Sequence, residues 1–167
     1  MNRLLCRNIS FSLFALVICM TACSRKVLRP IYSTNSVIEG LAATSYREPY
    51  LSNDWLVMLV ELNGRDKIQM INLKTRRKIF LPKLNSINGQ FIDLAVNSSG
   101  KIISFIVERD DTPELFIYRR SIGNLERIGL KPNDIPIRVS INGLGNRLAI
   151  EVMRNEVSDI DLIRIKI

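Results

Sequence analysis

Carboxylates have the widest scope for chemistry in this 167-residue sequence, because the chain contains no histidine. Without His there is no Ser-His-Asp triad, no Cys-His pair and no imidazole metal ligand. Asp110, Asp111, Asp159 and Asp161 fall at corresponding places between short apolar runs. Asp is favoured in turns, where its side chain accepts hydrogen bonds from nearby backbone N–H groups. We therefore interpret these residues as turn residues, with a weak calcium site as the alternative.

Other catalytic arrangements are missing from the sequence as well. It has no Gly-x-Ser-x-Gly elbow, no phosphate-binding loop and no dinucleotide fingerprint. Paired carboxylates for glycoside hydrolysis must face each other across a cleft, and nothing in their spacing indicates this. Trp55, at the start of an apolar run, is interpreted as a packing residue and not as a sugar-stacking platform. The sequence therefore predicts a protein that is not an enzyme, with no catalytic residue, cofactor or metal.

The first 23 residues have the order of a secretory signal. Arg3 and Arg7 precede an apolar run from Phe11 to Met20, and small residues follow at Thr21-Ala22-Cys23-Ser24. The apolar run is about half of the ~20 residues that a transmembrane helix needs. Ala22 before Cys23 resembles the lipobox of bacterial lipoproteins, although Met20 stands where that family prefers Leu, Val or Ile.

The lipobox resemblance implies a location. Residues 1–22 would be removed, and Cys23 would carry a diacylglycerol and an amide-linked acyl chain such as palmitate, which together anchor a protein firmly. Ser24 in place of Asp implies sorting to the outer membrane, with the protein facing the periplasm. Cys6 and Cys19 would be lost with the signal, so the mature domain has no disulfide and no cysteine nucleophile.

The mature chain of 145 residues is long enough for one domain with a substantial core. It carries 22 Lys and Arg against 16 Asp and Glu, a net charge of +6, with Arg76, Arg77 and Lys78 as the densest basic cluster. We interpret the basic residues as a scattered, solvated surface. The alternative is attraction to anionic envelope material, such as lipid headgroups, lipopolysaccharide or acidic polysaccharide. Nucleic acid is not an expected partner of an exported protein.

Repeats dominate the mature chain beyond a tether predicted at residues 23–45, which contains Pro30 and a Ser/Thr/Asn stretch. Residues 46–167 contain short β-branched and aromatic runs bounded by Gly, Asn, Asp and Pro, which is typical of antiparallel strands. Val96–Arg109 aligns with Ile141–Arg154 at an offset of 45, and Leu56–Glu61 aligns with Ile103–Glu108 at an offset of 47. Such a period in an all-β chain predicts propeller blades of four strands.

The middle unit shows the expected strands most clearly, at Phe91–Val96, Ile102–Glu108, Leu115–Arg119 and Leu125–Ile128. Gly100 and Gly145 occupy equivalent tight turns, where a positive φ costs Gly nothing. Asn53 takes this place in the first unit, since Asn tolerates that conformation better than most residues.

These repeats are similar to those of TolB-type propellers, which read Ser-Pro-Asp-Gly, then Leu-Ala-Phe, then Asp-Ile-Tyr. The matching segments are Asn97–Gly100 with Ile103–Phe105 and Glu114–Phe116, and Asn142–Gly145 with Leu148–Ile150 and Asp159–Asp161. The turn Asp is missing in every copy, and the amino-terminal α/β domain of TolB is absent. In TolB the propeller binds a peptidoglycan-associated lipoprotein. The resemblance therefore implies a non-enzymatic protein interaction module of the cell envelope, with Tol-Pal-like partners.

Three units cannot close a ring, because propellers have about 4 to 8 blades. The last unit ends after its third strand, which leaves an edge without a partner. One hypothesis is that a segment such as Ser36–Ala43 supplies the fourth strand in another subunit, so that a homodimer makes six blades; the alternative is an open stack of three sheets. Two other functions remain open: binding of an anionic polysaccharide or other envelope ligand by a basic β-sheet surface, and a degenerate enzyme propeller.

Overall fold

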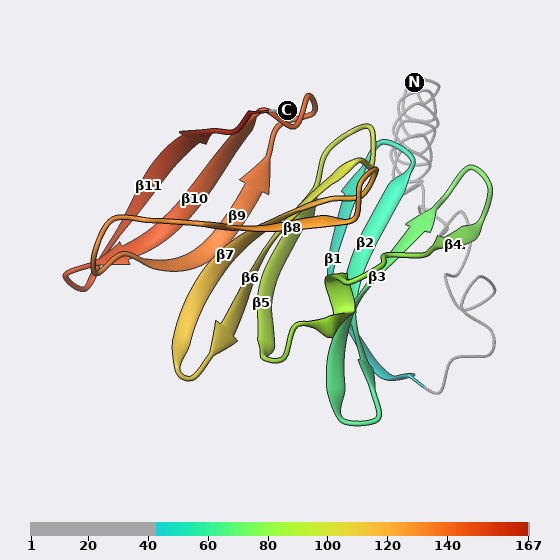
Figure 1. The fold of residues 1–167 in the computed structure, drawn as a ribbon, viewed down its shortest axis with the longest axis horizontal. Coiled ribbons are helices and arrows are strands. Elements are labelled where there is room, and N and C mark those ends of the chain that lie inside the picture. Colours follow the sequence, from blue (N-terminus) through green and yellow to red (C-terminus); the bar gives the residue numbers. More distant parts are fainter. Residues whose placement is uncertain (1–42, 167) are drawn as a thin grey trace, which may run out of the picture. The chain divides into compact units, whose positions relative to one another are not determined.

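The computed structural model describes residues 43–166, which form three antiparallel β-sheets in series (Figure 1). The N-terminal sheet contains β1 (Ala43–Ser52), β2 (Trp55–Leu62), β3 (Arg65–Asn72) and β4 (Arg77–Ile79). The middle sheet contains β5 (Gln90–Val96), β6 (Ile102–Arg109), β7 (Thr112–Arg119) and β8 (Asn124–Ile128). The C-terminal sheet contains β9 (Ile135–Ile141), β10 (Arg147–Arg154) and β11 (Val157–Arg164). A single 3-10 turn, η1 (Leu84–Ser86), precedes the middle sheet.

The predicted fold class is confirmed by these sheets. Each is a meander in which strands that follow one another in sequence are hydrogen-bonded neighbours, as in a propeller blade. Two sheets have four strands and the third has three, as the truncated last repeat predicts. Cys23, the predicted signal and all of Ser36–Ala43 except Ala43 lie outside the described residues. Between residues 43 and 166, no helix is long and apolar enough to cross a membrane.

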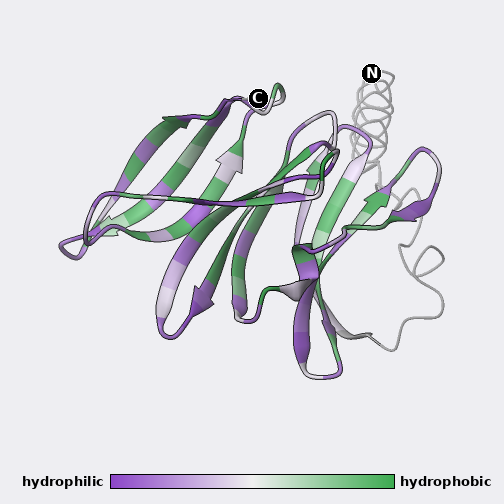
Figure 2. Cartoon of the chain, viewed as in Figure 1, coloured by the Kyte–Doolittle hydropathy of each residue, from purple (hydrophilic) through white to green (hydrophobic). Residues whose placement is uncertain are grey.

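Burial along the strands explains which sheets are covered on both faces. In β6 every residue from Ile102 to Val107 is buried, and in β7 the same holds from Leu115 to Tyr118. In β10, by contrast, Leu148, Ile150 and Val152 are buried and the residues between them are not. Side chains of a strand alternate between faces, so a continuous buried run indicates cover on both faces and an alternating run cover on one. Figure 2 shows this alternation of hydrophobic and hydrophilic residues along the strands of the C-terminal sheet.

The middle sheet shares a hydrophobic core with each of its neighbours. The core on the side of the N-terminal sheet includes Val57, Leu59, Met70, Phe105 and Phe116. The core on the side of the C-terminal sheet includes Ala95, Ile106, Ile117, Val139 and Ile150. Tyr50 of β1 packs against both cores. A third cluster, Met58, Val60 and Ile71, lies in the N-terminal sheet outside these two cores.

The internal repeat extends to irregularities of the backbone. The register of β5 against β6 shifts between Phe91 and Asp93, and the register of β9 against β10 shifts between Pro136 and Arg138. The two skipped residues, Ile92 and Ile137, are 45 positions apart, which is the offset of the sequence repeat. A β-bulge increases the local twist of a strand. The middle and C-terminal sheets therefore share the position of a β-bulge as well as the sequence repeat.

An asparagine closes the repeat turn of the middle sheet and that of the C-terminal sheet. The side-chain oxygen of Asn97 accepts hydrogen bonds from the backbone N–H groups of Lys101 and Ile102, both at 3.0 Å. Asn142 does the same for Asn146 and Arg147, again at 3.0 Å. These bonds replace backbone partners within the turn. They explain how the turns form although the Asp of the TolB-type pattern is missing.

Candidate functional site

The three predicted turn residues have left-handed backbones, and the two glycines among them pack between sheets. The φ angles are 52° at Asn53, 65° at Gly100 and 82° at Gly145. A Cβ atom at Gly100 would lie 2.4 Å from the ring of Trp55, and one at Gly145 would lie 2.9 Å from Cδ1 of Ile102. Trp55 and Ile102 both begin the second strand of the preceding sheet. The turn glycines thus allow consecutive sheets to approach closely.

Trp55 has the packing role predicted for it. Its half-buried ring lies against the hydrophobic core between the N-terminal and middle sheets. The guanidinium carbon of Arg120 is 5.1 Å from the ring centroid, and Arg120 Nε donates a hydrogen bond to the Gly100 carbonyl at 2.7 Å. A cation above an indole ring is attracted to its electron-rich face. The ring therefore joins the N-terminal sheet to the turn of the middle sheet.

The four carboxylates singled out in the sequence do not converge on one site. Asp110 and Asp111, with φ angles of 49° and 58°, form the two-residue turn between β6 and β7. Asp159 and Asp161 lie inside β11 and not in a turn, so the turn interpretation was wrong for these two; they accept hydrogen bonds from Arg154, at 2.6 Å and 3.0 Å. In the part of the chain that the structure describes, no group of three or more acidic or Cys side chains is placed to hold a metal ion.

Arg154 also binds Asp134, whose side chain is only 1% exposed. Arg154 Nε and Nη2 donate to the two carboxylate oxygens of Asp134 at 2.7 Å and 2.8 Å. This bidentate pair lowers the pKa of Asp134 below its usual range, chiefly through the hydrogen bond, and raises the pKa of Arg154. The loop before β9 is thereby fixed to the end of β10.

A basic segment, residues 67–92, is the strongest electrostatic feature of the mature chain. It contains no Asp or Glu, and its six cationic residues are Lys67, Lys74, Arg76, Arg77, Lys78 and Lys83. The rest of the mature chain has 16 residues of each sign, so this segment carries the whole net charge of +6. Interpreting the basic residues as scattered was therefore incomplete. The signal that could have identified the segment is the length of sequence without any acidic residue.

The basic segment is held by its apolar residues and turns its charges outward. β4 pairs only with Met70, Ile71 and Asn72 of β3, after which the chain leaves the sheet. Leu81 and Leu84 are buried in the core between the N-terminal and middle sheets. The Tyr118 hydroxyl donates a hydrogen bond to the Pro82 carbonyl at 2.9 Å. Phe80, between these anchors, is 85% exposed. An exposed aromatic ring is thus fixed among cations.

Asn85 completes the edge of β3 where β4 has left it. Its side-chain oxygen accepts a hydrogen bond from the Ile68 N–H at 2.8 Å, and its amide nitrogen donates to the Ile68 carbonyl at 3.0 Å. An Asn side chain offers one acceptor and two donors, so it can replace a neighbouring strand at one residue. The space between the departing β4 and the edge of β3 is left as a cavity.

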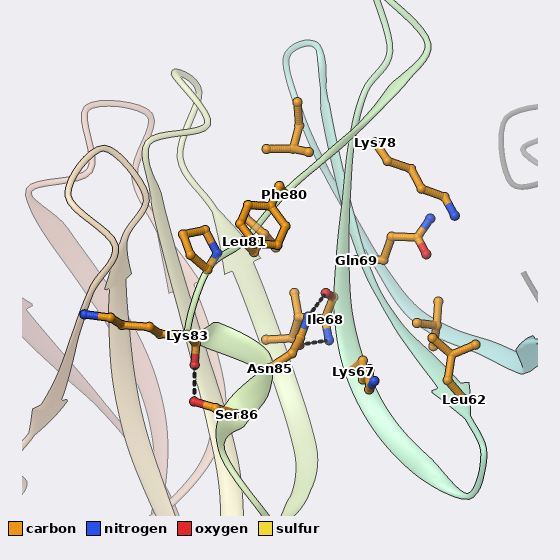
Figure 3. Close-up of a pocket in the computed structure, with 13 residues that line it drawn as sticks. Leu62, Lys67, Ile68, Gln69, Lys78, Phe80, Leu81, Lys83, Asn85 and Ser86 are labelled. Carbon is orange, nitrogen blue, oxygen red and sulfur yellow. Dashed lines mark hydrogen bonds between the residues drawn. The ribbon is translucent and has the colours of Figure 1, made fainter.

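This cavity has a volume of about 410 Å³, and Figure 3 shows its lining. Its charged residues are all basic: Lys67, Lys78 and Lys83. Lys78 of β4 pairs with Ile71 of β3. Gln69 is two residues before Ile71, so Lys78 and Gln69 lie on the same face of the sheet. Desolvation by the surrounding protein lowers the pKa of Lys78. The Gln69 amide nitrogen is buried and has no hydrogen-bond partner among the described residues.

The outer face of the C-terminal sheet, opposite its core face, is the second candidate surface. By the strand register it carries Ile135, Arg138, Ser140, Arg147, Ala149, Glu151, Met153, Ser158, Ile160, Leu162 and Arg164. Ile160 is 58% exposed and Leu162 is 80% exposed. Their counterparts in the middle sheet, Leu115 and Ile117, are 1% and 0% exposed, because the C-terminal sheet covers them.

Comparison with known proteins finds similar solved structures only. No family model matches the sequence, and no curated protein matches it either. The chain is similar to TolB from Acinetobacter baumannii, at 17% identity and a TM-score of 0.49, over 75% of this chain and 33% of that one. It is similar to the β-propeller domain of the Trilobed protease from Pyrococcus furiosus, at 13% identity and a TM-score of 0.49, over 74% and 43%. An acylaminoacyl peptidase from Pyrococcus horikoshii matches at 17% identity and a TM-score of 0.48, over 70% and 18%. The chain spans less than half the length of each of these proteins.

Proposed function

We propose that this protein is a non-enzymatic interaction module of the bacterial cell envelope, anchored by lipid at Cys23, which binds a partner protein through the outer face of its C-terminal sheet. The observation that carries the proposal is the exposure of Ile160 and Leu162. Both occupy positions that the next sheet covers in the middle unit. Exposed apolar residues that form a continuous patch are characteristic of interaction sites.

The charges around the patch indicate what the partner offers. Arg138, Arg147 and Arg164 border the apolar residues, and Glu151 is the one acidic residue on the face. Arg is enriched in protein interfaces, where it combines apolar contact with directional hydrogen bonds. Arg147 stands where Ile102 is found in the middle sheet, so the face differs from a blade interface in having a cationic rim. A partner with an acidic rim around an apolar centre complements it.

The resemblance of the repeats to TolB-type propellers suggests the class of partner. A peptidoglycan-associated lipoprotein or another Tol-Pal-like component is the first candidate. The expected location at the outer membrane, facing the periplasm, would place the module beside such partners.

The test is site-specific crosslinking of the full-length protein in cells. A photoreactive amino acid replaces Leu162 in one variant and Ile122, an apolar residue that is 70% exposed in a turn of the middle sheet, in the matched control. We expect one protein to be crosslinked at 162 and not at 122, and the adduct to be lost with Ile160→Lys and reduced with Cys23→Ala. Equal crosslinking at both positions would refute the interaction face. Identification of the adduct by mass spectrometry then separates a Tol-Pal-like component from another protein or a second copy of the chain.

A further inference from the structure

We propose that the basic segment is a second binding site, which docks on an anionic phospholipid surface with Phe80 in the interfacial region and phosphate groups on the surrounding cations. This site is independent of the protein interface proposed above, since its cations lie on the N-terminal sheet and on the connection to the middle sheet, and it shares no residue with the outer face of the C-terminal sheet.

The first support is the availability of the charges. Among residues 43–166, none of the ion pairs involves Lys67, Lys74, Arg77, Lys78 or Lys83. Asp66, the acidic residue that directly precedes Lys67, is paired with Arg47. Cations without an acidic neighbour attract anionic lipid surfaces, and each contributes additively near the surface.

The second support is the position of Phe80. Its backbone is fixed between Ile79, which pairs with Met70, and the buried Leu81. The ring, which is 85% exposed, therefore projects from a backbone that is held on both sides. A cationic surface with a projecting aromatic residue is the arrangement by which peripheral proteins combine electrostatic attraction with burial of apolar area at a membrane interface. A purely ionic polysaccharide would use the cations but not the exposed ring.

The third support is the cavity beside the ring. On the side of β3 where Gln69 and Lys78 lie (Figure 3), two donors suit a phosphate: the Lys78 ammonium group and the buried Gln69 amide nitrogen that has no described partner, whereas Lys83 extends away on the other side. Apolar residues such as Leu62 and Phe80 complete the lining. A phosphate oxygen accepts hydrogen bonds from both ammonium and amide groups. The lining therefore matches a headgroup attached to an apolar chain.

The fourth support is the path of the chain from its expected anchor. β1 begins at Ala43, which pairs with Leu62, and Leu62 lines the cavity. The expected lipid anchor, Cys23, is 20 residues before Ala43. Twenty residues reach at most about 70 Å even when fully extended. The anchored chain would therefore enter the domain beside the basic segment, within reach of the bilayer.

The experiment uses full-length protein in nanodiscs and detects lipid adducts. A photoreactive phenylalanine analogue replaces Phe80, or Leu144 as the matched control, in discs of phosphatidylglycerol with phosphatidylcholine and in discs of phosphatidylcholine alone. Leu144 is 74% exposed in the turn between β9 and β10. We expect lipid adducts at position 80 to exceed those at 144, and to be about tenfold fewer in phosphatidylcholine alone. Equal adducts at both positions, or in both kinds of disc, would overturn the proposal.

Two further arms test the charges and the source of the phosphate. Arg77→Gln, Lys78→Gln and Lys83→Gln together should reduce the adducts about tenfold. The control triple variant replaces three exposed cations outside both proposed sites, Lys101→Gln, Arg127→Gln and Lys131→Gln, and should leave the adducts unchanged. Equal effects of the two triple variants would show general charge attraction and overturn the site. Inorganic phosphate added at constant ionic strength should not displace the lipid; displacement would assign the site to a soluble anion instead.

Discussion

The carboxylate of Asp93 in the middle sheet accepts a hydrogen bond from the backbone N–H of Val139 in the C-terminal sheet at 2.7 Å. Asp93 follows the bulge of β5, and Val139 follows the bulge of β9 by two residues. The two bulges thus orient a side chain of one sheet toward the backbone of the next. Burial raises the pKa of Asp93 above 3.8, although the bonds from Val139 and Leu94 oppose this. The contact therefore couples the packing of two sheets to a titratable group.

Asp93→Asn should change how stability depends on pH. In the wild type the raised pKa means that the folded state binds a proton more tightly than the unfolded state, so the stabilising contribution is full below the unfolded pKa of 3.8 and is lost as pH rises through the raised pKa. Asn cannot titrate but can still accept the bond from Val139. We expect the variant to gain stability relative to the wild type between about pH 4 and pH 7 in urea unfolding. A constant difference across this range would contradict the shift.

Arg154→Met should also change how stability depends on pH, because the pKa of Asp134 is shifted in the opposite direction to that of Asp93. The pKa of Asp134 is lowered in the folded state, so its contribution is present above the unfolded pKa of 3.8 and is lost as pH falls through the lowered pKa. Without Arg154 this pH-dependent contribution disappears, and the variant should be less stable at neutral pH. Thermal unfolding from about pH 2 to pH 7 measures both effects. Arg138→Met is the control, since Arg138 is 77% exposed and 3.9 Å from Glu151.

Gly100→Ala should cost more stability than a positive φ alone explains. Gly64 has a φ of 72°, and a Cβ atom added there would have no atom within 4 Å, whereas a Cβ atom at Gly100 would meet the Trp55 ring at 2.4 Å. We expect Gly64→Ala to lose about 1 kcal/mol and Gly100→Ala clearly more, by chemical denaturation. Quenching or a shift of Trp55 fluorescence should accompany only the second variant. Equal losses would mean that the ring moves aside freely.

The repeat equivalence can be tested by placing the same substitution in two sheets. Ile117→Ser removes a fully buried side chain from the core between the middle and C-terminal sheets, and should lower the free energy of unfolding by about 3 kcal/mol or more. Leu162→Ser changes the equivalent position on the exposed face and should stay within about 0.5 kcal/mol. Urea unfolding of both variants measures the difference. A large loss with Leu162→Ser would show that the outer face is covered in the isolated protein.

The strands were predictable from the sequence because their apolar runs are short and separated by turn residues. The middle unit was predicted to within a few residues, and the missing fourth strand of the last unit was predicted as well. The contacts between sheets were not predictable, because a turn glycine in sequence does not reveal that Trp55 packs on Gly100 or Ile102 on Gly145. The basic segment was seen only as Arg76, Arg77 and Lys78, since the strand register and the early departure of β4 decide which cations gather around the cavity.

The sharing of cores has a consequence for how the molecule opens. Exposing β6 and β7 to solvent would disrupt two hydrophobic cores at once, whereas detaching β10 and β11 would disrupt one. Amide hydrogens of the middle sheet should therefore exchange with solvent only through global unfolding, and those of the C-terminal sheet through a smaller, more frequent opening. The sheet with the proposed protein interface then opens more readily than the middle sheet, and a bound partner would slow its exchange.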